Sequence, residues 1–107
     1  MDTLIAASPL PAFEPTHPGA VIRDVLATCR ISVTKAAARI HVTPPTLNNV
    51  VRGTASISPD MALRLGRLCG NSPEMWLRLQ EHYDLWHRQR ALADDLATIQ
   101  ALQFEPA

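Results

Sequence analysis

Small polar side chains gather in one short segment of the sequence, where they could recognise the edges of nucleic-acid bases. Two threonines and two adjacent asparagines fall between residues 43 and 49. An asparagine amide can form paired hydrogen bonds with adenine, and a threonine methyl or a proline ring can contact a thymine methyl. The alternative is a solvated polar helix face on which Thr43 serves only as the N-cap. The predicted base contacts in the major groove of DNA are Thr43, Pro45, Thr46, Asn48 and Asn49.

Basic residues flank that segment and could hold the DNA backbone. Lys35, Arg39 and Arg52 are predicted phosphate contacts, because such contacts position a protein on the duplex. Ordinary exposed charge is the alternative for each of them. Arg64 and Arg67 lie three residues apart and are expected to face solvent or to pair with acids. Ten basic and ten acidic residues give zero net charge, which argues against a protein that binds polyanions without sequence preference.

Helix boundaries are marked by the same pair of residues at several places. A serine or threonine that can cap a helix is followed by a proline, which the first turn tolerates because its missing N–H would be unpaired there. Thr43-Pro44, Ser58-Pro59 and Ser72-Pro73 have this pattern. Together with the apolar periodicity, these signals predict an all-α fold of five helices. The expected helices span 18–29, 33–40, 44–52, 59–69 and 73 onward, the last one extended at its C-terminal end.

Residues 33–53 have the organisation of a helix-turn-helix. Two short predicted helices are joined by only three residues, 41–43, and Ala37 supplies the small side chain needed where the helices cross. His41 stands where this tight turn usually carries glycine, because the backbone there favours a positive φ. With the crossing angle fixed, the start of the second helix could enter a major groove. The apolar residues expected to fix that angle are Ile40, Val42, Leu47 and Val50.

A wider set of motifs, over residues 17–86, resembles the HigA-type antitoxins of the Cro/CI (XRE) helix-turn-helix family. The resemblance implies a lambda-repressor-like domain that binds a palindromic operator of its own operon, as double-stranded DNA, in the form of a homodimer. It also implies a second partner, a RelE-like toxin that cleaves mRNA on the ribosome and that the antitoxin neutralises. The matching stretches are His17-Pro18-Gly19, Ala37-x-x-Ile40, Leu47-x-x-Val50-x-x-Gly53, 57–65 and 72–86.

The sequence departs from the family pattern at His41 and at the pair Pro44-Pro45. Related proteins often place Arg, Gln or Ser at the start of the recognition helix, so the two prolines remove hydrogen-bond donors near the bases. Two alternatives stay open. One is a stand-alone XRE-family transcriptional repressor without a toxin partner. The other is an interaction module whose helix-turn-helix no longer binds DNA.

The fifth predicted helix carries two apolar stripes, and one domain core can cover only one of them. The first stripe is Trp76, Leu79, Tyr83 and Trp86, and the second is Leu85, Leu92, Leu96 and Ile99. We therefore expect the C-terminal half to pair two copies of the chain. The competing interpretation is that residues 91–103 fold back over their own domain. The predicted dimer interface comprises Trp76, Tyr83, Trp86, Leu92, Leu96 and Ile99.

No group of residues has the spacing of an enzyme active site or a metal site. The chain has only four glycines and no glycine-rich phosphate loop. His82 and His87 lie five residues apart, whereas metal-binding histidines on one helix face lie three or four apart. We expect no catalysis, cofactor, metal or small-molecule substrate. Cys29 and Cys69 fall on apolar stripes and are expected to be buried free thiols.

The remaining expectations concern the organisation and location of the chain. No secretory signal is visible, and no apolar run reaches the roughly 18 residues that a membrane span needs. We therefore expect a soluble, cytoplasmic bacterial protein without membrane contact. Its parts are predicted to be a flexible arm at 1–16, a helix-turn-helix domain at 17–90, and a helical extension with a tail at 91–107.

Overall fold

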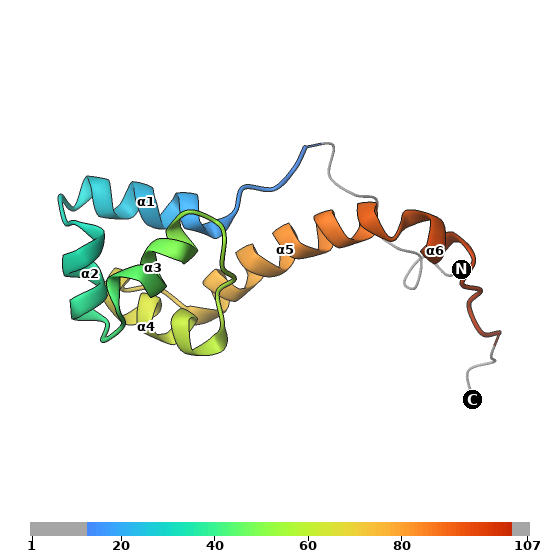
Figure 1. Ribbon diagram of the computed structural model, residues 1–107. Coiled ribbons are helices and arrows are strands. Elements are labelled where there is room, and N and C mark those ends of the chain that lie inside the picture. The colour runs from blue at the N-terminus through green and yellow to red at the C-terminus, as the bar shows by residue number, and fades with distance from the viewer. Residues whose placement is uncertain (1–12, 104–107) are drawn as a thin grey trace, which may run out of the picture.

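The computed structural model describes residues 13–103, and within that range the chain forms six helices and no strand. The all-α prediction is therefore confirmed, and the ends predicted for the first four helices lie within one residue of the observed ends. No helix in this range is long and apolar enough to cross a membrane. The helices labelled in Figure 1 are α1 (Pro18–Thr28), α2 (Val33–Arg39), α3 (Pro44–Val51), α4 (Pro59–Cys69), α5 (Pro73–Ala91) and α6 (Ala93–Ala97).

Side-chain caps mark the N-termini of α1 to α5, whereas α6 has none. The Ser32 hydroxyl accepts a hydrogen bond from an amide in the first turn of α2, and Ser58 and Ser72 do the same for α4 and α5. α1 is capped by His17, whose Nδ1 accepts from the Gly19 N–H at 2.9 Å. Each cap satisfies a backbone donor that has no partner inside its own helix.

The long C-terminal helix expected from the sequence is divided in two. The break falls at Leu92, whose φ of −101° and ψ of 10° leave the helical region. Charge favours a break here, because Arg88 and Arg90 suit the negative C-terminal end of α5. Asp94 and Asp95 suit the positive N-terminal end of α6 in the same way. The second apolar stripe continues across this break, so apolar periodicity alone does not predict that the helix ends there.

The core lies where α1 to α4 meet the first turns of α5. Beyond that point α5 extends away from the other helices and carries α6 at its far end (Figure 1). Trp76 is fully buried in the core, with its indole N–H donating to Asn71 Oδ1 at 2.8 Å. The buried apolar residues are Ile22, Leu26, Ala36, Ala37, Ile40, Leu47, Val50, Val51, Ile57, Met61, Ala62, Leu65 and Trp76.

The structure corrects several expectations about burial. Cys29 is exposed, because it follows the last turn of α1 as the C-cap, and Cys69 is only half-buried; both thiols are free. Tyr83 and Trp86 are half-buried, because α5 leaves the core after its first turns. Trp76, in contrast, has no exposed surface to offer a second chain. Its place in the predicted dimer interface is therefore wrong.

The second half of α5 packs against the segment that precedes α1. The Tyr83 ring lies edge-on to His17, with ring centroids 4.8 Å apart, and is tilted against His87 at 4.4 Å. A hydrogen bond joins His87 Nε2 to the Glu14 carboxylate. Glu14 and His17, in the segment that leads into α1, are thus both in contact with α5. Most of the predicted flexible arm, residues 1–12, lies outside the described residues.

Candidate nucleic-acid interface

α3 is fixed in the domain by its apolar side and by close backbone contact with α1. Leu47 is fully buried and Val50 is 2% exposed. Gly19 lies directly against the end of α3, since a Cβ at this position would sit 2.2 Å from the carbonyl oxygen of Val50. Arg23 reaches the same end and donates to the Val51 carbonyl at 3.3 Å. The glycine of the motif His17-Pro18-Gly19 is therefore what allows α1 to hold α3.

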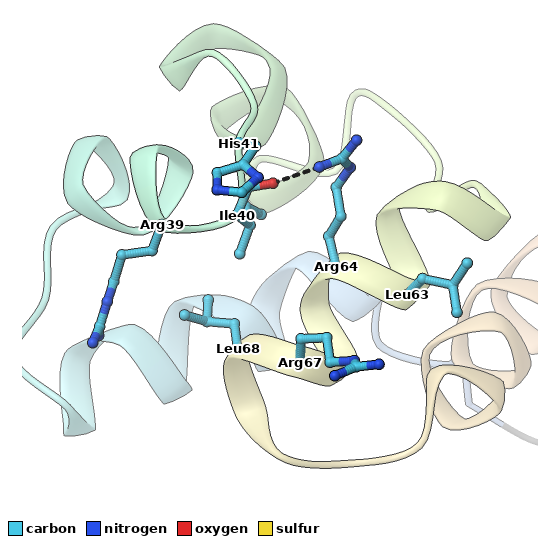
Figure 2. A pocket seen from close by; sticks show the side chains of 7 residues that line it. All are labelled: Arg39, Ile40, His41, Leu63, Arg64, Arg67 and Leu68. Atoms are coloured by element: carbon cyan, nitrogen blue, oxygen red, sulfur yellow. Dashed lines mark hydrogen bonds between the residues drawn. The ribbon is translucent and has the colours of Figure 1, made fainter.

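The turn between α2 and α3 has the left-handed backbone that the sequence predicted. His41 has a φ of 66°, and the Val42 N–H donates to the Ala37 carbonyl at 3.0 Å. Arg64, expected to face solvent or to pair with an acid, is half-buried and has no acidic partner among residues 13–103. Instead its guanidinium donates to the Ile40 carbonyl at 2.8 Å (Figure 2). α4 thereby fastens the end of α2 immediately before the turn.

The outward side of α3 borders a shallow hollow that it shares with the first turn of α2. The structure brings Pro45, Asn48, Asn49 and Arg52 together there. Within the described part of the chain, the side-chain amide of Asn49 has no hydrogen-bond partner, although its backbone carbonyl accepts from Thr54. An exposed amide without a partner can offer both a donor and an acceptor to a ligand. The complete lining of this α3 hollow is Val33, Thr34, Pro44, Pro45, Asn48, Asn49 and Arg52.

The two threonines of the predicted set lie at the N-terminus of α3. Their hydroxyl oxygens are 2.7 Å apart and share a hydrogen bond. The Thr46 N–H also donates to Thr43 Oγ1 at 3.3 Å, so Thr43 is the N-cap of α3. Both residues are exposed. Because the two hydroxyls share one hydrogen bond, one of them keeps a free O–H donor that another molecule could accept from.

The predicted phosphate contacts are not gathered in one place. Arg52 lines the α3 hollow, and Lys35 is exposed in the first turn of α2. Arg39 lines a different pocket, between α2 and α4. Val33 and Thr34 do line the α3 hollow, but sequence reasoning did not select them. Their place depends on how α2 packs across α3, which the residue pattern of either helix does not reveal.

Comparison with known proteins agrees with this arrangement of helices. The family model described as Helix-turn-helix matches residues 22–76, which is about half of the chain. The chain belongs to this family. A curated relative, virulence-associated protein A' of Dichelobacter nodosus, is 37% identical over 86 residues, which cover 79% of this helix-turn-helix chain and 75% of the relative.

Solved structures of HigA-family antitoxins are similar over most of the chain. The antitoxin HigA of Pseudomonas aeruginosa, solved with the higBA promoter, is 37% identical with a TM-score of 0.78, covering 83% of this chain and 99% of that one. A HigA-family antidote protein of an addiction module from Coxiella burnetii is 26% identical with a TM-score of 0.80, covering 84% and 100%. The structural neighbours of this helix-turn-helix protein are thus those that its motifs implied.

Proposed function

We propose that this helix-turn-helix protein is an antitoxin that also represses its own operon. In this proposal a homodimer binds a palindromic operator, with α3 of each copy in a major groove. The second partner is a RelE-like toxin that cleaves mRNA on the ribosome. Support comes from the free outward face of α3 and from the similarity to the Pseudomonas aeruginosa antitoxin HigA, which was solved with its promoter.

The observation that carries the proposal is the position of Asn49. Its amide stands in the α3 hollow with Asn48 and Arg52, on a helix whose opposite side is buried. A paired contact between an asparagine amide and adenine discriminates that base from the others. Arg52 at the edge of the same hollow could meet a phosphate. In this proposal one helix face supplies both the base contact and the phosphate contact.

The test is operator binding by the variant Asn49→Ala, measured by fluorescence anisotropy with DNA from upstream of the gene. Loss of a paired base contact should weaken operator binding by about 1–3 kcal/mol and leave binding to unrelated DNA unchanged. Gln100→Ala, which removes an exposed amide outside α3, is the matched control and should bind as the wild type does. Unchanged operator affinity of Asn49→Ala would show that this face does not select bases.

The same assay addresses the two alternatives. If the wild-type protein shows no preference for the upstream DNA, α3 does not recognise bases, as the pair Pro44-Pro45 would explain. The chain would then be an interaction module. Co-expression with the neighbouring gene then separates an antitoxin from a stand-alone repressor. Co-purification with a small basic protein is expected for the antitoxin. A stand-alone repressor would bind the operator and purify without that partner.

The homodimer of this proposal has its candidate interface in and around α6, beyond the end of α5. Leu92, Leu96 and Ile99 are 37%, 42% and 66% exposed in the single chain. Tyr83 and Trp86, also predicted for the interface, lie earlier on α5 and are half-buried. Exposed apolar side chains that lie close together commonly mark an interface. A dimer would also let two copies of α3 reach successive major grooves on one side of the duplex.

A further inference from the structure

A second pocket lies between the C-terminal end of α2 and the outward side of α4 (Figure 2). We call it the α2–α4 pocket. It has no lining residue in common with the α3 hollow, although it includes Arg39, one of the predicted phosphate contacts. Arg39 and His41 line it from α2 and the turn. Leu63, Arg64, Arg67 and Leu68 line it from α4.

The chemistry of the α2–α4 pocket is cationic and apolar at once. It has three guanidinium groups, and no carboxylate among residues 13–103 lies within ion-pair distance of any of them. Arg64 is already held in place by its hydrogen bond to the Ile40 carbonyl. Leu63 is 58% exposed beside these groups. A surface of this kind fits carboxylates, which guanidinium groups bind in pairs of hydrogen bonds, together with an apolar side chain.

The opposite chemistry is found on α5. A hollow along this helix, here called the α5 hollow, is lined by the carboxylates of Glu74, Glu81 and Asp84, and Arg78 is the one basic residue among its lining residues. Leu85, 52% exposed, lies at its side. One acid is fixed in position, because Gln80 donates to Asp84 Oδ1 at 3.0 Å.

Gln80 itself is nearly fully buried. Its side-chain carbonyl accepts from the Ile57 N–H at 2.9 Å, so the residue that orients Asp84 is anchored in the core. The hydroxyl of Ser72 lowers the pKa of Glu74, mainly through a hydrogen bond to that carboxylate, and so favours its charged form. The α5 hollow therefore presents two carboxylates that hydrogen bonds hold in place, Glu74 and Asp84, beside an exposed leucine.

The two surfaces complement each other in charge and in exposed apolar groups, but they share no residue and form separate pockets of one chain. We propose that the α2–α4 pocket is a docking site for the α5 hollow of a second copy of this chain. DNA phosphates could satisfy the arginines, but they would leave Leu63 in water. The contact is distinct from the apolar seam at Leu92, Leu96 and Ile99 and depends on neither toxin nor operator.

Charge exchange between Arg67 and Glu81 tests this proposal in the full-length protein. Both residues are exposed, and neither has an ion-pair partner among the described residues. Sedimentation across a series of protein concentrations should show an association step that weakens when NaCl is raised from about 50 to about 500 mM, because salt screens exposed charges. Each single variant, Arg67→Glu or Glu81→Arg, would place like charges opposite each other in the contact between two copies. The dissociation constant of the association step should therefore rise about tenfold or more.

Mixing the two single variants provides the decisive measurement. In the mixture each substituted residue meets an opposite charge on the other chain, so the salt-sensitive step should return to within a few-fold of wild type. Arg88→Glu, which reverses an exposed arginine that lines neither pocket, is the control and should leave the step unchanged. Failure of the mixture to recover would overturn the proposal. The proposal would also be overturned if Arg67→Glu lost operator affinity while its association step in sedimentation stayed unchanged. That result would show that the pocket binds DNA phosphates.

Discussion

His41 holds a left-handed backbone conformation at the bend of the helix-turn-helix. This could be predicted from the resemblance, because the tight turn of a helix-turn-helix usually carries glycine at this position, which favours a positive φ. The exposure of Asn49 was predictable for a different reason, since helical periodicity alone places it opposite the buried Leu47 and Val50. Arg64 could not be placed, because its partner Ile40 is 24 residues away and is reached only through the packing of α4. Local geometry is visible in a sequence, but contacts between distant segments are not.

Replacing His41 with glycine should raise the free energy of unfolding by about 0.4–1 kcal/mol. Glycine relieves the strain of a positive φ, and the greater freedom of the unfolded chain offsets part of that gain. Thermal denaturation followed by circular dichroism measures the change. Arg30→Gly is the matched comparison, because Arg30 also has a positive φ, of 54°. If only His41→Gly lowers the melting temperature, the imidazole makes contacts that outweigh the strain.

Acidification should destabilise the protein through His17. Burial lowers the pKa of His17 below its ordinary value of 6.5, and the nearby Asp84 carboxylate offsets only part of that effect. As the pH falls from 6.5 toward the lowered pKa, the unfolded chain binds more protons than the folded one, so stability is lost in that range. Protonation of Nδ1 also removes the acceptor that caps α1.

Urea denaturation across this pH range measures the effect of His17. His17→Asn keeps a capping side chain that does not titrate, so its stability should fall less on acidification. His87→Gln removes a different histidine and should retain the fall seen in the wild type. Equal pH dependence in His17→Asn and wild type would mean that another group is responsible.

At the scale of whole elements, helix starts were easier to predict than the relations between helices. A capping serine or threonine with a following proline acts within one turn, so α3, α4 and α5 begin where those pairs stand. The approach of α1 to α3 is different, because it depends on Gly19 meeting backbone atoms 31 and 32 residues later. The resemblance to known antitoxins pointed to that glycine, but helical periodicity gave no reason for it.

Gly19→Ala should therefore destabilise the protein, although alanine favours a helix over glycine by about 1 kcal/mol. The new Cβ would meet the Val50 and Val51 carbonyl oxygens at 2.2 and 2.6 Å, and these are backbone atoms that cannot rotate away. Displacing α3 should cost about 2 kcal/mol net. Operator binding should weaken with it, because α3 carries the proposed base contacts.

Gly70→Ala is the control that separates this steric clash from the general effect of replacing a glycine with alanine. A Cβ at Gly70 has no atom within 4 Å, so only its φ of 71° opposes the change. That strain should cost about 1 kcal/mol and leave operator binding intact. Chemical denaturation of both variants gives the comparison, and a Gly19→Ala protein as stable as Gly70→Ala would contradict the close packing of α1 on α3.

The shape of the whole molecule argues against one interpretation of its C-terminal apolar stripe, in which residues 91–103 fold back over their own domain. If residues 91–103 covered their own domain, their leucines would be buried against α1 to α4. Instead α6 lies at the far end of α5, away from the other helices (Figure 1). Leu92, Leu96 and Ile99 remain exposed there. The apolar stripe could be predicted from the sequence. Whether it faces its own domain or solvent could not, since that depends on how far α5 extends beyond the core.

Truncation after Gln89 should therefore weaken the dimer without unfolding the domain. The deletion removes Leu92, Leu96 and Ile99 but none of the buried core residues, so the helical circular dichroism of the remainder should persist. Three apolar side chains lost from each copy should raise the dissociation constant by about a hundredfold or more, measured by sedimentation. The full-length double variant Leu92→Ser/Leu96→Ser should show part of the same loss with the chain length unchanged. A truncated dimer as tight as the full-length one would move the seam to Tyr83 and Trp86 or to α1.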